Sequence, residues 1–251
     1  MLKLDKIHKS FQNSDGKQNH VLKNISFHVH TGEFVAIVGP SGCGKTTLLK
    51  IIAGLEESNS GDLNLQNTAV IGPHKDCGIV FQDFALFPWL TVSENIMFGP
   101  CSEAKKNQDK GVIKNTLEYL LSVTRLEEHK DKYPHVLSGG MQQRVAIART
   151  LANNPKIVCM DEPFAALDVV TRSKMQEFLL EIWERKRKTV VFVTHDIEEA
   201  LFLADRVFVL GSDGEGIKRE LKVPFSRPRN NELKYTQDFV GLKKKMIEFL
   251  R

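Results

Sequence analysis

The segment GEFVAIVGPSGCGKTTLLKIIAG, residues 32–54, limits the folds open to this chain more than any other. It begins with a short apolar run at Phe34–Val38, turns through a stretch with three glycines, and continues as a helical pattern from near Lys45. A strand that passes through a glycine-rich turn into a helix is a building block of α/β folds. The segment therefore predicts a strand in a sheet that is covered by helices.

Three further apolar runs have the length and the Val and Ile content of buried parallel strands: Ile157–Met160, Val190–Val193 and Val207–Leu210. A helical pattern lies between the first two, with apolar residues spaced i, i+3, i+4, i+7 and i+8. Strands that alternate with helices predict an α/β fold with a mostly parallel sheet and right-handed crossovers. The residues of the helical stripe are Met175, Phe178, Leu179, Ile182 and Trp183.

The chain departs from this alternation in two regions. LKLDKIHKSF and HVLKNISFHVH alternate like antiparallel strands joined by a polar turn at Asn13–Asn19, and we expect an antiparallel flank at about residues 1–35 and 60–80. Residues from about 88 to 154 show helical patterns at Val112–Leu121 and Met141–Asn153, so we expect an inserted helical subdomain there. The 251 residues can form this as one large domain, with a C-terminal tail at about 222–251.

The turn GPSGCGKT, Gly39–Thr46, has the spacing of a phosphate-binding loop. Its glycines let backbone N–H groups point inward at phosphate oxygens, and the following helix aims its positive end at the same place. Lys45 would reach the β- and γ-phosphates, and the Thr46 hydroxyl would bind Mg²⁺. The nucleotide-binding residues predicted here are Gly39, Pro40, Ser41, Gly42, Cys43, Gly44, Lys45, Thr46 and Thr47.

Two acids follow the strand expected at Ile157–Met160. Ligands of open α/β sheets bind at the carboxyl ends of the strands, which is where Asp161 and Glu162 stand. Asp161 suits the holding of Mg²⁺ beside Thr46, and Glu162 suits the polarising of an attacking water. A structural role for Glu162, with Asp161 alone functional, stays open as the alternative.

A histidine stands at the tip of the strand expected at Val190–Val193. His195 could hydrogen-bond a γ-phosphate, and Asp196 caps a helix whose first turn holds Glu198 and Glu199. His28 and His30 would share one face of an exposed strand, where an ordinary solvated face is favoured over a metal pair.

A second glycine turn, LSGGMQQR, spans Leu137–Arg144. Ser138 is an N-cap residue, and Gly139 and Gly140 leave the N–H groups of the first helical turn unobstructed. The turn is therefore a second candidate for binding an anion. An ordinary capped helix without a ligand is the alternative.

In one order the chain carries GPSGCGKTT, the glutamine of FQD, LSGGMQQR, VCMDE, ALD and the histidine of THD. Together these motifs resemble the nucleotide-binding subunit of an ABC transporter over essentially the whole chain. The resemblance implies an ATPase with a RecA-like, P-loop NTPase core that uses ATP and Mg²⁺. It also implies a homodimer or a pair with a sister subunit, arranged head to tail.

The resemblance assigns further roles residue by residue. The signature turn, Ser138, Gly139, Gly140 and Met141, would close over the ATP bound by the partner subunit, and Asp168 would lie in a loop at the dimer interface. Phe11 would stack on adenine, although it could simply pack in the antiparallel flank. Gln82 would contact Mg²⁺ and report to the membrane subunit. Met141 departs from the pattern, since many members have glutamine there.

The phrases FPWLTVSENI, DEPFAALDVVTR and THDIEEALFLADRV, with the tail VPFSRPRN, are similar to importer subunits of the nitrate, sulfonate and taurine group, which includes importers of pyrimidine precursors. The aromatic run in Gln82–Leu90 is implied to seat a short helix of an integral membrane permease, with core packing as the alternative. A solute-binding protein would be an indirect partner. We therefore expect a peripheral protein on the cytoplasmic face of the cell membrane.

Composition excludes several other functions. The net charge of +4 is mild and does not by itself suggest a nucleic-acid partner, which usually calls for a concentrated basic face. The N-terminus MLKLDKIHKSF lacks the apolar segment of a signal peptide, no apolar run reaches the ~18 residues of a membrane span, and no CxxC pair is present. A soluble ABC ATPase acting on ribosomes or DNA, a small-molecule kinase and an exporter subunit stay as less favoured alternatives.

Overall fold

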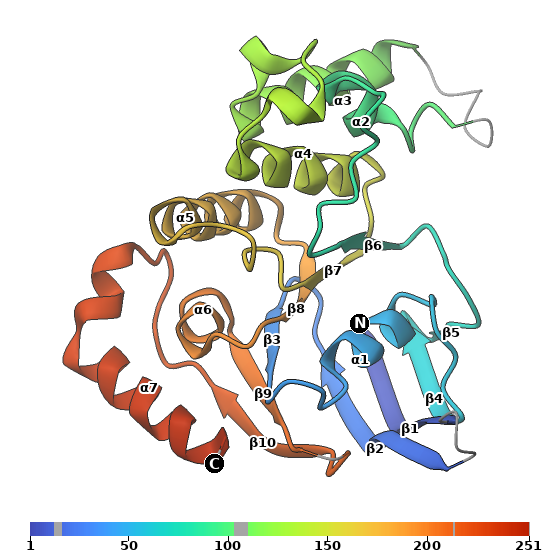
Figure 1. Ribbon diagram of the computed structural model, residues 1–251, viewed down its shortest axis with the longest axis vertical. Helices are drawn as coiled ribbons and strands as arrows, with labels where there is room; N and C mark the ends of the chain where they lie inside the picture. Colours follow the sequence, from blue (N-terminus) through green and yellow to red (C-terminus); the bar gives the residue numbers. More distant parts are fainter. Residues whose placement is uncertain (13–16, 103–109, 213, 251) are drawn as a thin grey trace.

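The computed structural model describes residues 1–12, 17–102, 110–212 and 214–250. Its centre is a six-stranded sheet in the order β10-β9-β3-β8-β7-β6 (Figure 1). Five strands are parallel, and β10 at one edge pairs antiparallel with β9. The strands are β3 Phe34–Val38, β6 Cys77–Val80, β7 Ile157–Asp161, β8 Thr189–Val193, β9 Arg206–Leu210 and β10 Ile217–Lys222. The predicted α/β core is confirmed.

Helices cover both faces of this sheet because its strands are apolar on both sides. In β3, Phe34 and Val38 face a cluster shared with α5 (Val169–Lys186), α6 (Ile197–Leu203) and α7 (Gln237–Leu250). Val35 and Ile37 face the opposite cluster, which contains the side chains of α1 (Lys45–Ile52). The apolar stripe predicted from Met175 to Trp183 is buried on α5.

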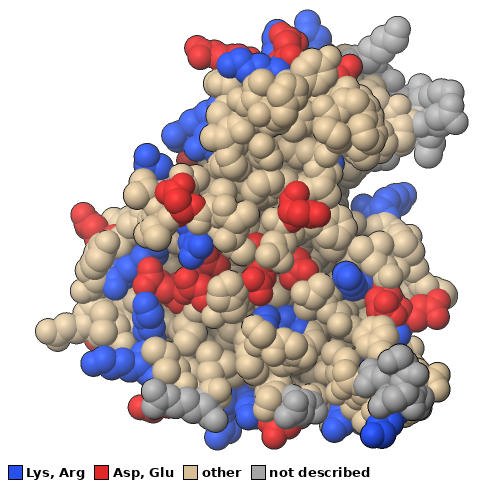
Figure 2. Space-filling view, in the orientation of Figure 1, with Lys and Arg blue, Asp and Glu red and all other residues tan. Residues whose placement is uncertain are grey.

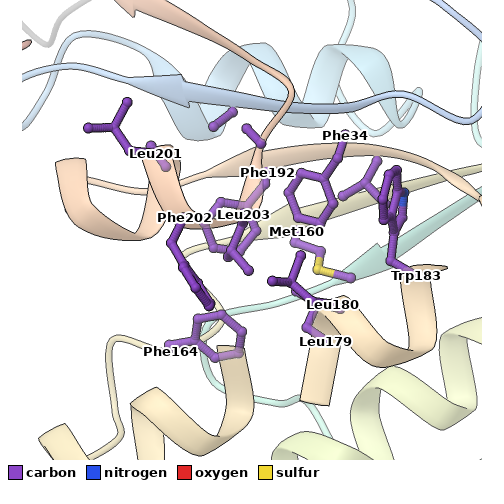
Figure 3. Close-up of a cluster of buried hydrophobic side chains, with 14 of the residues drawn as sticks. Phe34, Met160, Phe164, Leu179, Leu180, Trp183, Phe192, Leu201, Phe202 and Leu203 are labelled. Atoms are coloured by element: carbon purple, nitrogen blue, oxygen red, sulfur yellow. The ribbon is translucent and has the colours of Figure 1, made fainter. Parts of the chain in front are cut away.

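Large aromatic side chains fill the first of these clusters (Figure 3). The ring centroids of Phe34 and Trp183 lie 5.9 Å apart at a nearly perpendicular angle, and those of Phe164 and Phe192 lie 5.8 Å apart. Each such side chain contributes about 1.5–3 kcal/mol when it is fully buried. The cluster therefore fixes α5 and α6 against the strands that precede them.

The antiparallel flank is a separate four-stranded sheet in the order β2-β1-β4-β5. Its strands are β1 Leu2–Gln12, β2 Gln18–Val29, β4 Ser60–Leu65 and β5 Thr68–Ala69. Residues 13–16 of the predicted turn Asn13–Asn19 lie outside the described residues. The flank was expected to reach residue 80, but β6 instead pairs parallel with β7 and belongs to the central sheet. The run CGIV is short, and its pattern suits a parallel strand as well as an antiparallel one. The sequence therefore did not reveal this pairing.

The helical subdomain forms one end of the molecule, and its helix α4 lies nearest to the central sheet (Figure 1). It contains α2 (Val92–Met97), α3 (Lys110–Thr124), two 3₁₀ turns (Glu127–His129 and Pro134–Val136) and α4 (Gly139–Ala152). A capping box between Thr91 and Glu94 starts α2. The helix α4 joins two apolar clusters, since Val145 and Ala148 face the subdomain while Ala146 and Ile147 face the central core.

Past β10 the tail continues through the 3₁₀ helix η4 (Asn231–Tyr235) into α7. None of the described helices has the length and the apolar character that a membrane span requires.

Candidate functional site

The predicted functional residues gather at one edge of the central sheet because β3, β8 and β7 are neighbours and parallel. The phosphate loop, defined as Gly39–Thr46, follows β3, while Glu162 follows β7 and His195 follows β8. Asp161 is the last residue of β7 and is paired with Val193. Three segments that are far apart in the sequence thus end beside one another.

The phosphate loop depends on backbone conformations that favour glycine. Gly42 and Gly44 have φ of 81° and 95°, in the left-handed region. A Cβ atom on Gly44 would also lie 2.7 Å from Leu22 Cδ2. The buried Lys45 ammonium donates hydrogen bonds to the carbonyl oxygens of Gly39 (2.9 Å) and Pro40 (2.8 Å). A positive charge is therefore held within the curl of the loop, where a phosphate would bind.

A direct hydrogen bond joins the phosphate loop to β7. Thr46 Oγ1 donates to Asp161 Oδ1 at 3.1 Å. Burial raises the pKa of Asp161, and the bond from Thr46 opposes this rise. A hydroxyl and a carboxylate are hard oxygen donors of the kind that hold Mg²⁺ together with phosphate oxygens and water. Because a nearby cation would offset the cost of burying the Asp161 charge, these residues fit Mg²⁺.

Glu162 and His195 form the second contact at this edge. His195 Nδ1 lies 2.7 Å from Glu162 Oε2. A carboxylate can only accept, so Nδ1 carries a proton. Glu162 has φ of 42°, an uncommon conformation for a non-glycine residue, and its N–H group donates to Val193 O at 2.9 Å. The backbone is therefore bent sharply after Asp161, and the two adjacent acids contact different partners, Thr46 and His195.

The helix after His195 is fixed at its start by buried polar contacts. Asp196 Oδ1 accepts from the N–H groups of Glu198 (2.8 Å) and Glu199 (3.4 Å), as the capping prediction required. Glu199 is buried and accepts from Thr194 Oγ1 at 2.7 Å and from Gln176 Nε2 at 3.1 Å. Burial raises the pKa of Glu199. The sequence pattern predicted only that Glu199 lies in the first helical turn and did not reveal its buried contacts with Thr194 and Gln176.

The signature turn, Ser138–Met141, begins α4. Ser138 Oγ accepts from the N–H group of Met141 at 3.4 Å, which is the predicted N-cap. The two glycines also serve packing, because a Cβ atom on Gly140 would lie 2.7 Å from Thr171 Cγ2 on α5. Sequence analysis explained these glycines by access to N–H groups alone. Close packing of the starts of α4 and α5 is a second reason for them.

Asp168, expected at a dimer interface, caps α5. Its Oδ1 accepts from the N–H groups of Val170 and Thr171, both at 3.0 Å, and hydrogen bonds from Thr171 and the backbone lower its pKa. Val169 and Val170 are 79% and 63% exposed. An apolar pair therefore lies exposed beside the cap, and the dimer-interface role of Asp168 stays a prediction.

Phe11 and Gln82 are both exposed. The ring of Phe11 on β1 lies under the Lys9 ammonium, 4.8 Å from its centroid. Gln82 follows β6. At the predicted Mg²⁺ site the hydrogen bond joins Thr46 to Asp161, and Gln82 takes no part in it. The adenine-stacking role of Phe11 and the Mg²⁺ contact of Gln82 stay predictions.

The aromatic run after Gln82 divides between the core and the surface. Phe84 and Leu86 pack against the central cluster. Phe87 contacts the rings of Trp89 and Phe98, with centroid distances of 5.7 and 4.3 Å. Trp89 is 70% exposed and Phe98 is 50% exposed. Core packing thus accounts for Phe84 and Leu86, while a docking role for the exposed part of the run stays a prediction.

The arginines of VPFSRPRN hold the far end of α6, a function that the sequence pattern did not reveal. Arg229 Nη1 donates to the carbonyl oxygens of Leu201, Phe202 and Ala204 at 3.3, 3.0 and 2.8 Å. Burial lowers the pKa of Arg229 to about 10. Arg227 bonds the carboxylate of Asp205 and the carbonyl oxygen of Leu203. The tail therefore caps the helix that begins next to His195.

The charge distribution adds a broader feature. On the face drawn in Figure 2, acidic side chains gather in the band between the helical subdomain and the central sheet, while basic side chains are scattered.

His28 and His30 contact each other through their Nε2 atoms at 3.1 Å. In the described part of the chain, no group of three or more His, Cys, Asp or Glu is arranged to hold a metal.

Comparisons with known proteins agree with this geometry. A family model described as ABC transporter matches residues 22–165. The chain is 49% identical over 210 residues to a nitrate import ATP-binding protein of Synechocystis sp., covering 83% of this chain and 78% of that protein. It is 42% identical over 247 residues to an aliphatic sulfonates import ATP-binding protein of Bacillus cereus, covering 98% and 94%.

A solved structure is similar as well. It is a dimeric ATP-binding cassette in a post-hydrolysis state, bound to ADP and Pi. The match has a TM-score of 0.76 and 36% sequence identity, and it covers 90% of this chain and 100% of that one.

Proposed function

This chain belongs to the ABC transporter family, and we propose that it is the ATP-hydrolysing subunit of an importer for a small solute such as a sulfonate, taurine or nitrate. The relatives named for nitrate and sulfonate import match most of its length. Hydrolysis is the activity of such subunits, and the similar cassette holds its products.

The contact that supports hydrolysis most directly is the 2.7 Å hydrogen bond between Glu162 Oε2 and His195 Nδ1. Glu162 is the proposed base that polarises the attacking water, and His195 is the proposed partner of the γ-phosphate. Lys45 in the phosphate loop would stabilise the charge that develops on the transferred group.

We propose that Thr46, Asp161 and Gln82 hold Mg²⁺ when the nucleotide is bound. Thr46 and Asp161 already contact each other at 3.1 Å, so both oxygens can reach one ion with little rearrangement. Mg²⁺ would neutralise charge on the β- and γ-phosphates.

The working unit is proposed to be a head-to-tail pair of subunits. The signature turn of one subunit would present Ser138 and the N–H groups of α4 to the ATP of the other. Asp168, Val169 and Val170 lie exposed at the start of α5, where they could meet the partner. The similar cassette is itself a dimer.

An integral membrane permease is the proposed partner at the segment Gln82–Leu90. The exposed ring of Trp89, with Phe87 and Phe98 beside it, offers an apolar anchor for a helix. This contact would keep the chain at the cytoplasmic face of the membrane. A separate solute-binding protein would then deliver the cargo.

The decisive experiment is Glu162→Gln, with Glu118→Gln as a matched control because Glu118 is exposed in α3. Loss of the carboxylate base should reduce phosphate release by roughly a hundredfold or more. ATP binding should persist, and ATP should then trap a dimer that is visible by size-exclusion chromatography. Phosphate release near that of the wild type in Glu162→Gln would contradict the assignment.

A further inference from the structure

The segment that carries Gln82 is fixed to α4 by an arginine fork. Arg149 Nη1 donates to Ala85 O at 2.6 Å, and Nη2 donates to Phe84 O at 2.9 Å. We call residues 81–85 the Gln82 loop. Its carbonyl groups are thus held by one planar side chain from a helix that lies more than sixty positions later in the chain.

This part of the Gln82 loop has a backbone that needs such support. Phe84 and Ala85 have φ of 61° and 45°, and neither is glycine. Left-handed conformations of residues other than glycine are strained and persist only where the surroundings enforce them. The two bonds from Arg149 go to the carbonyl oxygens of these same two residues. A lysine could bond only as a point charge and could not match both carbonyls with a rigid fork.

The neighbouring residue of α4 holds the other side of the loop. Thr150 Oγ1 donates to the carbonyl oxygen of Ile79 in β6 at 3.0 Å and also reaches Ala146 O at 3.0 Å. A Cβ atom on Gly78 would lie 2.6 Å from Thr150 Cγ2, so β6 and α4 are closely packed. The backbone on both sides of Gln82 therefore rests on one turn of α4.

The same helix begins at the signature turn. Ser138 caps α4, and Arg149 follows eleven positions later, or roughly 15 Å along a helix axis. The α4 side chains from Val145 to Ala148, which lie between them, are buried in the two clusters, which makes the helix a stiff connection. Arg149 also lies over the Phe87 ring, with Cζ 5.5 Å from its centroid, and Asn95 holds the backbone of Phe87 on both sides.

We propose that Arg149 is a positioning residue for ATP hydrolysis, which joins the Gln82 loop to α4 so that Gln82 and the signature turn move as one body. The proposal rests on the proposed function, in which Gln82 serves the Mg²⁺ of its own subunit and Ser138 serves the ATP of the partner. Arg149 touches neither group and acts by fixing the carbonyls of Phe84 and Ala85.

The test compares Arg149→Lys with the control Arg185→Lys, because Arg185 is exposed and pairs with Glu181 one turn away on the same helix. Hydrogen exchange at the amides of residues 81–91 is measured first, without nucleotide. Arg149→Lys should exchange faster there by roughly tenfold, as expected for the loss of one charged hydrogen bond, while the control stays unchanged.

The second measurement is the Mg²⁺ concentration for half-maximal phosphate release at saturating ATP. It should rise several-fold in Arg149→Lys, while the affinity for ATP without Mg²⁺ is unchanged. Faster exchange with an unchanged Mg²⁺ requirement would show a purely structural bond and would overturn the proposal, as would unchanged exchange. Absence of phosphate release by the wild type would instead refute the proposed function. The exchange measurement would still show whether Arg149 fixes the Gln82 loop.

A milder variant covers the case in which Arg149→Lys does not fold. Thr150→Val keeps the volume of the side chain but removes its bond to Ile79 O. It should speed amide exchange at residues 81–91 and raise the Mg²⁺ concentration for half-maximal phosphate release. Each change should be smaller than in Arg149→Lys. No change in either quantity would contradict the two-sided attachment of the loop.

Discussion

The imidazole of His195 and the carboxylate of Glu162 are joined by a 2.7 Å hydrogen bond between Nδ1 and Oε2. The bond connects the end of β8 to the end of β7 and leaves the second ring nitrogen of His195 for another partner. It thus fixes which nitrogen of the ring can meet a phosphate. Any change in His195 should alter both the orientation of Glu162 and the contact to the nucleotide.

Replacement of His195 by alanine should therefore affect turnover more than binding. We expect phosphate release at saturating ATP to fall by about 10²–10³-fold, the range for loss of one hydrogen-bond donor to the charge that develops in the transition state. The ATP concentration for half-maximal binding should change little, because the phosphate loop is intact. His28→Ala on the exposed face of β2 is the control and should behave as the wild type.

The partly buried carboxylate of Asp161 predicts a conflict between stability and activity. Because its folded pKa is raised above the ordinary value of 3.8, the charged form costs stability as the pH rises through the folded pKa. Asp161→Asn should therefore melt at a higher temperature than the wild type at pH 7 without nucleotide. This advantage should vanish below about pH 3.8, where both side chains are neutral.

The same variant should lose Mg²⁺-dependent phosphate release, since an amide is a poor ligand for that ion. Asp238→Asn in the first turn of α7 is the control for the general effect of removing an acid. A lower melting temperature of Asp161→Asn at pH 7 would contradict the stated cost of the buried charge.

In the signature turn, the roles of the backbone and of the side chains can be tested separately. The N–H group of Met141, and not its thioether, contacts Ser138. We expect Met141→Gln to change ATP-driven dimer formation by less than about twofold, while Ser138→Arg blocks hydrolysis by filling the space of the partner's phosphate. Light scattering with ATP measures the first effect, and phosphate release measures the second. A large change in Met141→Gln would assign a role to the side chain.

Packing between Gly140 and Thr171 can be tested by a double-mutant cycle. Gly140→Ala places a methyl group 2.7 Å from Thr171 Cγ2, and Thr171→Ser removes that atom. The double variant should therefore be more stable than the sum of the single changes by about 0.5–3 kcal/mol, measured by urea unfolding. A coupling energy near zero would mean that the starts of α4 and α5 separate at no cost.

The tail is expected to stabilise α6. Arg229→Met removes the donors to three carbonyl oxygens at the end of that helix, which should lower the free energy of unfolding by about 1–3 kcal/mol. Arg219→Met, at an exposed position on β10, should cost much less. Phosphate release by the folded Arg229→Met protein tests whether the other end of α6, next to His195, is disturbed as well.

Much of this fold was predictable because its strongest signals are local. The run Phe34–Val38 is buried on both faces, and its neighbour in sequence is the phosphate loop, so strand, turn and helix are encoded together. The stripe on α5 likewise follows from helical spacing. By contrast, β6 has only four residues, and its pairing with β7 is decided by packing against α4.

The strand-end positions of Asp161 and Glu162 were predicted from the sequence, but the contacts of the residues around the proposed site were not. Glu199 and Arg229 act through atoms on other elements, among them Gln176 and the backbone carbonyls of α6. Arg149 likewise bonds backbone atoms more than sixty positions away. Backbone carbonyl groups carry no sequence signature, so such contacts emerge only when the chain is folded.

The position of α4 between two apolar clusters has a consequence for how the protein tolerates change. Val145 and Ala148 must suit the helical subdomain, Ala146 and Ile147 must suit the central core, and Thr150 must suit β6. Helix α3 instead turns a large part of its surface to solvent. In a random-mutagenesis library we therefore expect many tolerated substitutions in α3 and few in α4. Among related sequences, the exposed surface of α3 should likewise vary more than α4.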